Sequence, residues 1–212
     1  MKFGRKSSPA DEPVDEQETT DPDPAPVAPS RGPHDIADVD VESDGVERVD
    51  LGGMLIAPAP GLELRLQVDE ASESVQAVLV AGTDGAVELR AFAAARGGDM
   101  WDDVRRQIAA DTAQRGGTAS EREGPWGTEL TCQVQVTTTE GKVGRQDSRV
   151  VGIQGPRWLL RATFLGQPAT SPEKASAYED VVADVVVRRG SVAMAPGDPI
   201  PLTLPPQARR MS

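Results

Sequence analysis

The segment with the most distinctive chemistry reads Gly155-Pro-Arg-Trp-Leu-Leu-Arg161. If it forms a strand, Arg157 and Arg161 lie on one face, because side chains alternate along a strand. Two guanidinium groups on one face could hold a carboxylate or a phosphate through paired hydrogen bonds. They could equally pair with Glu129 or Glu88 on neighbouring strands. The sequence leaves both interpretations open.

Carboxylates gather around the segment Gly124-Pro-Trp-Gly127, which follows Glu121 and Glu123 and precedes Glu129. Paired carboxylates can act as acid and base or bind a hard metal ion, but no ligand spacing typical of a metal loop is present. We therefore expect a polar loop that leads into a strand, with no metal site and no catalytic residue. The candidate binding residues are Glu129 and Trp126, together with the two arginines.

Single copies of two residue types exclude several chemistries. The only histidine, His34, lies in a segment rich in proline and acid, and the only cysteine is Cys132. Serine or cysteine nucleophiles need an imidazole held close by, and zinc sites need several such ligands. Cys132 is therefore expected to be a buried apolar side chain. The chain also has neither a phosphate-binding Gly-Lys-Ser/Thr loop nor a Gly-x-Gly-x-x-Gly run, so we expect no cofactor.

The charge of the chain is concentrated at its N-terminus. Residues 1–50 carry 14 acidic and 5 basic side chains, a net charge of −9, whereas the remaining 162 residues carry a net charge of −3. Residues 1–46 hold many prolines and few large apolar side chains, so we expect a disordered acidic tail. A nearly neutral body argues against nucleic-acid binding. The expected organisation is this tail, a folded domain over 47–192 and an extended proline-rich tail over 193–212.

Alternating apolar and polar residues predict several strands in consecutive blocks. In the clearest case, Leu62, Leu64, Leu66 and Val68 share one face and polar residues occupy the other. The predicted strands cover 62–68, 76–81, 86–93, 130–136, 149–153 and 158–165.

Two helices are predicted from a different period. Trp101, Val104, Ile108 and Thr112 form one stripe of a helix, and Ser171-Pro-Glu173 is typical of the start of a second. Because hairpin-linked strands precede each helix, the expected fold is α+β, an antiparallel sheet of about six to eight strands with two packed helices. PsbP-like and Mog1-like modules are fold-level analogies only.

The sequence also predicts where the protein resides. No stretch of 18 apolar residues occurs, and the basic start Met1-Lys-Phe-Gly-Arg-Lys-Ser is followed by acids and prolines instead of an apolar export segment. We therefore expect no membrane insertion and a cytoplasmic location.

Several spaced segments resemble an actinobacterial family defined only as a domain of unknown function. They are Val49-Asp-Leu-Gly-Gly, Met100-Trp-Asp-Asp-Val-Arg105, Gly124-Pro-Trp-Gly-Thr-Glu-Leu130, Gly155-Pro-Arg-Trp-Leu-Leu-Arg161, Val186-Val-Arg-Arg-Gly190 and Pro201-Leu-Thr-Leu-Pro205. The resemblance covers about residues 46–206. It implies an actinobacterial cytoplasmic protein and supplies no activity, substrate or catalytic residue.

Two functional hypotheses remain open. The first is a non-catalytic protein-binding or adaptor domain that uses its sheet face or the strand with Arg157 and Arg161 to hold an unknown protein partner. The second is a small-ligand-binding protein or an enzyme that uses carboxylates and arginine, without histidine, zinc or a phosphate loop. The second hypothesis requires a pocket where Arg157 or Arg161 meets Glu123 or Glu129.

Overall fold

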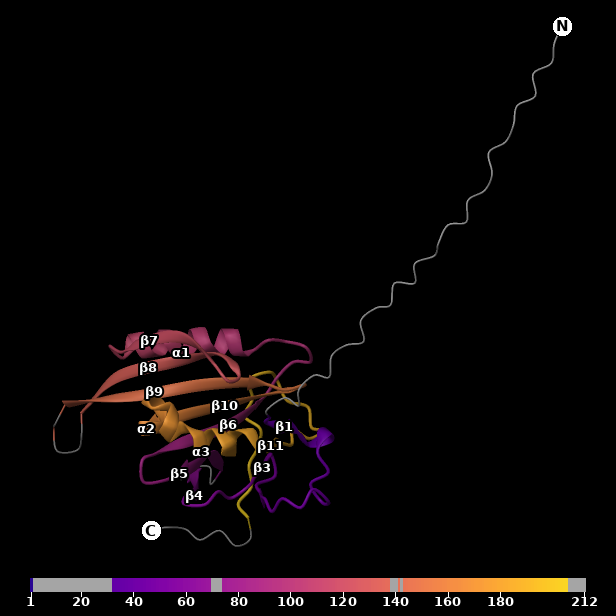
Figure 1. Ribbon diagram of the computed structural model, residues 1–212, viewed down its shortest axis with the longest axis horizontal. Helices are drawn as coiled ribbons and strands as arrows, with labels where there is room; N and C mark the ends of the chain where they lie inside the picture. The colour runs from indigo at the N-terminus through magenta and orange to yellow at the C-terminus, as the bar shows by residue number, and fades with distance from the viewer. Residues whose placement is uncertain (2–31, 70–73, 138–140, 142, 206–212) are drawn as a thin grey trace. The chain divides into compact units, whose positions relative to one another are not determined.

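The computed structural model describes residue 1 and residues 32–69, 74–137, 141 and 143–205. Figure 1 shows the arrangement of its helices and strands. In chain order they are β1 (His34–Asp35), the 3-10 helix η1 (Ile36–Asp38), β2 (Val49–Asp50), β3 (Met54–Ile56), β4 (Glu63–Val68), β5 (Val75–Ala81), β6 (Gly85–Ala93), α1 (Trp101–Gln114), β7 (Thr118–Gly124), β8 (Gly127–Thr137), β9 (Val143–Gln154), β10 (Trp158–Gly166), α2 (Gln167–Thr170), α3 (Pro172–Ala183) and β11 (Val186–Val187).

The main element is a seven-stranded antiparallel sheet with the order β4-β5-β6-β10-β9-β8-β7. β10 is its central strand, which agrees with apolar residues on both of its faces, since a central strand is covered on both sides. Leu159 and Leu160 are both fully buried there. The α+β fold with a largely antiparallel sheet, expected from the sequence, is confirmed.

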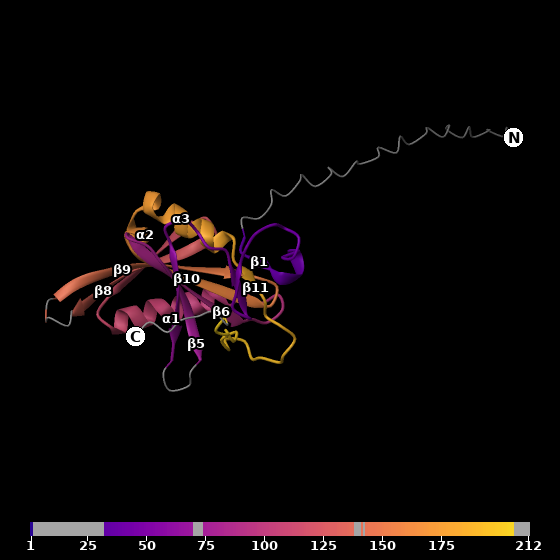
Figure 2. The same ribbon diagram turned by 90° about the horizontal axis from the view of Figure 1, so that it is seen from below.

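Helices lie on both faces of this sheet. Figure 2 shows α1 on one side of the sheet and α3 on the other. α1 packs across β7, β8 and β9, and its apolar stripe of Trp101, Val104 and Ile108 meets Leu130 and Val150. The face of the helix that the sequence predicted to be buried is therefore the one that packs on the sheet. Within the described residues, no helix is long and apolar enough to cross a membrane.

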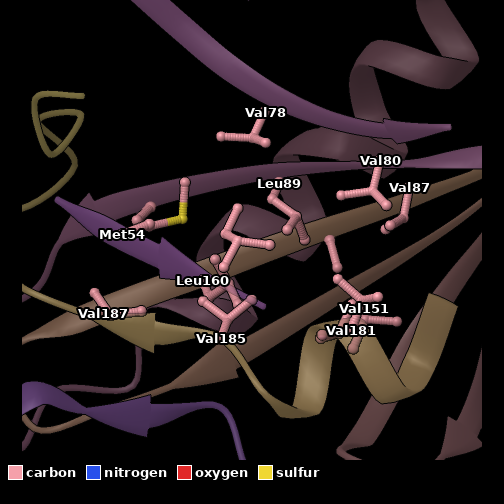
Figure 3. Close-up of a cluster of buried hydrophobic side chains, with 14 of the residues drawn as sticks. Met54, Val78, Val80, Val87, Leu89, Val151, Leu160, Val181, Val185 and Val187 are labelled. Carbon is pink, nitrogen blue, oxygen red and sulfur yellow. The ribbon is translucent and has the colours of Figure 1, made fainter. Parts of the chain in front are cut away.

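The larger core lies on the α3 side of the sheet. Alternate residues of the central strands bury their side chains there, and Figure 3 shows Leu160 and Leu89 among them. Val181 of α3 packs into the same cluster, close to Val151 of β9. Burying one such side chain contributes about 1.5–3 kcal/mol to folding. This core stabilises the central strands of the sheet, which carry Arg161 and the residues around it.

A second, four-stranded sheet with the order β1-β11-β3-β2 changes one expectation. The sequence placed His34 in a disordered tail that ends at residue 46. In the structure His34 pairs with Val186, its backbone N–H donates to Val185 at 2.8 Å, and Asp35 accepts a hydrogen bond from the Trp158 indole at 2.7 Å. Order therefore begins earlier than composition indicated, because long-range partners hold these polar residues. Residues 2–31 of the predicted tail lie outside the described residues.

The seven-stranded sheet contains one strand that the sequence did not reveal. The segment around Glu121 and Glu123, expected to be a polar loop, forms β7 at the edge of the main sheet. An edge strand with charged side chains carries little apolar alternation, because only Ala119 packs against the α1 cluster. The turn at Gly124 and Gly127 then returns the chain into β8.

The C-terminal segment is part of the folded body where it is described. It crosses the end of β6, where the N–H of Ala93 donates to Asp198 at 2.8 Å and the N–H of Ile200 donates to Ala91 at 2.9 Å. Ile200 is buried in the larger core. The extended conformation expected after residue 193 thus includes backbone pairing with the sheet.

Candidate functional site

Arg161 stands in the middle of β10, directly opposite Arg90 on β6. Arg90 Nε donates a hydrogen bond of 2.9 Å to Glu88 Oε1, and Arg161 Nη2 lies 3.9 Å from the same oxygen. The Arg161 guanidinium also lies 5.4 Å from the centroid of the Phe92 ring, within the range of a cation–π contact. Two arginines therefore share one carboxylate. The cross-strand partner Glu88, expected from the sequence as one alternative, is present.

This group is only partly accessible to water. The side chains of Arg161, Arg90 and Glu88 are 24%, 32% and 18% exposed. Burial, followed by the nearby charge of Arg90, lowers the pKa of Arg161, while Glu88 acts in the opposite direction. The Nε of Arg161 is buried and has no hydrogen-bond acceptor among the described residues. The positive charge at Arg161 is therefore incompletely compensated.

The surroundings of Arg161 form one half of a sheet face. α1 lies on this face over β7 to β9. The helix in close contact with β6 and β10 is α2, and its Ala169 belongs to the larger core on the other side of the sheet. Leu79, which is opposite Glu88, and Phe92 are partly exposed there. We name the group Leu79, Glu88, Arg90, Phe92 and Arg161 the arginine face.

Arg157 lies apart from this face. It precedes β10, in the turn after β9, and its side chain is exposed. Together with Arg188 and Arg189, which follow β11, it lines a depression of about 350 Å³ that also includes Asp35 and Asp38. We name this depression the arginine cavity. The sequence did not predict that these two segments meet, since 30 residues lie between Arg157 and Arg188.

Trp126 lies in the tight turn between β7 and β8 and lines a different depression, of about 540 Å³, at the start of α1. Its indole N–H donates to the carbonyl of Gly32 at 2.6 Å, which ties the first described residues to this turn. Pro156 lines both depressions, so the two adjoin at the turn before β10.

The polar groups around the Trp126 depression bond chiefly to one another. The Trp101 indole N–H donates to the Thr128 carbonyl at 2.7 Å, and Asp99 accepts from the Trp101 backbone at 3.1 Å. Arg105 pairs with Asp102 at 2.9 Å and with Glu121 at 2.8 Å. Because these donors and acceptors are occupied, the depression is better suited to anchor α1 than to bind a polar ligand.

Glu129 is fully buried on the opposite face of the sheet from Arg161. Its Oε1 lies 2.7 Å from Arg122 Nη2, and its Oε2 lies 4.0 Å from Arg149 Nε. Neither oxygen has a partner with hydrogen-bond alignment among the described residues, so these contacts are ion pairs of poor geometry. Arg149 also reaches Glu179 of α3 at 2.6 Å. Glu129 thus belongs to a buried ionic network.

The four candidate residues therefore do not form one constellation. Trp126 and Arg157 lie in adjoining depressions, Arg161 lies on the arginine face, and Glu129 lies on the other side of the sheet. Glu123 accepts a hydrogen bond from Thr128 at 2.8 Å and meets neither arginine. The geometry required by a carboxylate–arginine enzyme is absent among these residues.

The histidine and the cysteine also lie in different parts of the fold. Cys132 is buried on β8 in the cluster beneath α1, whereas His34 belongs to the four-stranded sheet. His34 is therefore ordered, contrary to expectation, but it is not positioned to activate this thiol. Within the described residues, no group of three or more histidine, cysteine, aspartate or glutamate side chains could hold a metal ion.

We predict that Cys132 reacts slowly with thiol reagents. Burial raises the pKa of the Cys132 thiol, outweighing a hydrogen bond with Thr112 that lowers it. At pH 8 the folded protein therefore holds less thiolate than a free cysteine does, and the thiolate is the reactive form. A chromogenic disulfide should modify the native protein far more slowly than the urea-unfolded protein. Equal rates in the two states would contradict the prediction.

The sequence did not single out Arg90, Arg188, Arg189 or Asp35 as site residues. The signal that could have found two of them is the pair of arginines in Val186-Val-Arg-Arg-Gly190, directly after a buried strand. No local signal relates Arg90 to Arg161, because their pairing depends on the order of strands in the sheet.

Comparisons with known proteins complete the description of the site. A family model described as "Protein of unknown function (DUF3710)" matches residues 32–211. No curated protein matches the chain. A crystal structure from Bacteroides thetaiotaomicron VPI-5482 is 15% identical, with a TM-score of 0.39, and the match covers 64% of this chain and 45% of that one. The chain thus spans less than half the length of that structure. The family resemblance expected from the sequence is confirmed and extends to residue 32.

Proposed function

We propose that this chain, which belongs to the DUF3710 family, is a non-catalytic protein-binding domain that holds an acidic segment of a partner protein on its arginine face. The observation that carries the proposal is the sharing of Glu88 by Arg90 and Arg161. A carboxylate from a partner would add a second acceptor at the accessible part of the Arg161 side chain, which is 24% exposed and lies no closer than 3.9 Å to Glu88. Charge-assisted bonds of this kind are stronger than neutral ones.

The composition of the arginine face also suits a protein partner. Arginine and aromatic residues are enriched in protein interfaces, and Phe92 lies beside Arg161. Leu79 adds partly exposed apolar area next to the charged group. An extended acidic segment with apolar residues at alternate positions would match both features.

Charge complementarity favours an acidic partner over a second copy of the same face. Two copies packed face to face would bring Arg90 and Arg161 of one protomer against the same arginines of the other. Like charges that face each other across an interface raise the free energy of the complex by several kcal/mol. An acidic segment has the opposite effect, because it neutralises the surplus charge.

The test uses the full chain as bait in lysate of the native host, with a photo-cross-linking residue in place of Thr163, which lies on the same sheet face as Arg161. We expect a partner to be cross-linked through an acidic segment. Arg161→Met should reduce the cross-linked yield at least tenfold, a loss of about 1.4 kcal/mol of binding free energy. Added salt should weaken the interaction as well.

Arg115→Gln is the matched control, because Arg115 is an exposed arginine at the end of α1. This variant should retain the partner. The proposal fails if no partner is cross-linked, if Arg161→Met retains it fully, or if the cross-linked segment is basic.

The same proposal includes the setting of the protein. A fold whose only cysteine is a buried free thiol does not depend on disulfides, which supports a cytoplasmic location. The net charge of −12 supports a protein partner over nucleic acid.

A further inference from the structure

We propose that the arginine cavity binds a small organic oxyanion, a carboxylate or a phosphate monoester, independently of the arginine face. Three arginines, Arg157, Arg188 and Arg189, line one depression of about 350 Å³. That volume falls within the range of small-molecule sites. Each guanidinium presents donors in a planar fork that matches the oxygens of carboxylate and phosphate.

Two of these arginines are held in place by the protein itself. Arg188 Nη1 bonds both carboxylate oxygens of Asp50, at 3.0 and 2.9 Å, and the carbonyl of Gly52 at 3.1 Å. Arg189 Nη1 donates to the carbonyls of Gly190 and Val192 at 3.1 and 3.0 Å. These bonds occupy Nη1 of each group and leave Nη2 of each for a ligand. A group already held in place loses less conformational entropy when it binds.

Among the described residues, neither acid that lines the cavity forms an ion pair with its arginines. Asp35 is already engaged, since its Oδ1 accepts from Ala37 N–H at 2.9 Å and its Oδ2 accepts from the Trp158 indole at 2.7 Å. Among the described residues, neither Arg157 nor Arg189 has a carboxylate partner, and Asp38 has no ion-pair or hydrogen-bond partner. The cavity thus contains two arginines without a carboxylate partner and two acids, Asp35 and Asp38, that form no ion pair with its arginines.

The remaining lining limits the class of ligand. Ile36, Ala37 and Pro156 add apolar groups to the lining of the cavity. A ligand with a short apolar body and one oxyanion group fits this division better than a multiply charged ion. The unpaired Asp38 also disfavours a second negative charge on the ligand.

Binding of two probes, inorganic phosphate and butyrate, to the full chain tests the proposal, and butyramide serves as the neutral analogue. Titration calorimetry and the shift of the Gly190 backbone amide in NMR spectra report binding at the cavity. We expect at least one anion to bind and butyramide not to bind. The stronger of the two probes identifies the ligand as a phosphate or a carboxylate.

Three variants make the result specific. Arg157→Gln should lower the affinity for the anion at least tenfold. Because the Arg157 side chain is exposed, this substitution should leave the folded body intact. Asp38→Asn should tighten binding, because it removes the unpaired negative charge. Arg115→Gln should change nothing. The proposal is overturned if neither anion binds, if butyramide binds equally well, or if Arg157→Gln and Asp38→Asn both leave the affinity unchanged.

Discussion

Replacing Arg149 with methionine is expected to lower the free energy of unfolding by about 3–5 kcal/mol, the usual cost of removing one partner of a buried ion pair. Arg149 is 3% exposed, and its guanidinium lies between Glu179 at 2.6 Å and Glu129 at 4.0 Å. It also lies 4.0 Å from the centroid of the Phe164 ring. Methionine restores much of the volume but none of the charge.

The size of this effect follows from the burial of Glu129. Without Arg149, the fully buried carboxylate would keep only Arg122, whose side chain is 44% exposed. Neither Glu129 oxygen has an aligned donor among the described residues, so little hydrogen bonding remains to offset the loss. A buried charge without adequate pairing costs several kcal/mol.

Arg145→Met provides a control on the same strand. Arg145 also pairs with an acid, Asp147, at 3.2 Å, but its side chain is 64% exposed. Exposed pairs typically contribute less than about 1 kcal/mol. Urea denaturation of both variants measures the difference. Equal losses for Arg145→Met and Arg149→Met would show that the network contributes no more than a surface pair.

The double variant Glu129→Met/Arg149→Met separates charge from packing. It removes the buried acid together with its partner, and hydrophobic replacement of a buried pair is often neutral or stabilising. We expect the double variant to be more stable than Arg149→Met alone. A strictly additive loss would mean that the two charges do not interact.

Much of the fold could be predicted because its strands and helices carry strong periodic patterns. The stripe of Trp101, Val104 and Ile108 predicted α1 and the face that it buries. β10 is apolar on both faces, a pattern typical of a strand in the middle of a sheet, and it lies at the centre of the seven-stranded sheet. β7 was missed for the opposite reason, since an edge strand needs little apolar surface.

The candidate site could be predicted only in part, because its residues come together through tertiary contacts. The pairing of Arg161 with Glu88 was one expected alternative, and it is found across two neighbouring strands. The cavity that joins Arg157 to Arg188 depends on where β11 meets the rest of the fold. The order of His34 and Asp35 depends on Trp158, 123 residues further along the chain. These contacts join residues that are distant in the sequence, so local sequence patterns could not predict them.

Replacing Gly152 with alanine is expected to destabilise the protein by about 3 kcal/mol. Gly152 lies on β9 opposite Arg161, and the ring of Trp101 lies directly on its backbone. A Cβ at this position would approach the Trp101 ring atoms Cδ2 and Cε3 more closely than 3.0 Å, so the indole would have to move. The ring is 7% exposed and cannot move without opening the cluster beneath α1.

Displacement of Trp101 would have two consequences that can be measured. Its indole N–H would lose the bond of 2.7 Å to Thr128, and a buried carbonyl without its donor costs about 1–3 kcal/mol. The exposed indole should also shift tryptophan emission to longer wavelength. Urea denaturation and fluorescence together report the loss of stability and its cause.

Gly144→Ala is the matched control, because Gly144 lies on the same strand. The nearest atom to a Cβ there is the Val136 carbonyl oxygen at 4.0 Å, an ordinary contact. This variant should be neutral or slightly more stable, since alanine has less conformational freedom to lose.

In the double variant Gly152→Ala/Trp101→Leu the smaller side chain removes the overlap, so its loss of unfolding free energy should be less than the sum of the losses of the two single variants. Additive losses would place the cost of Gly152→Ala elsewhere than at Trp101.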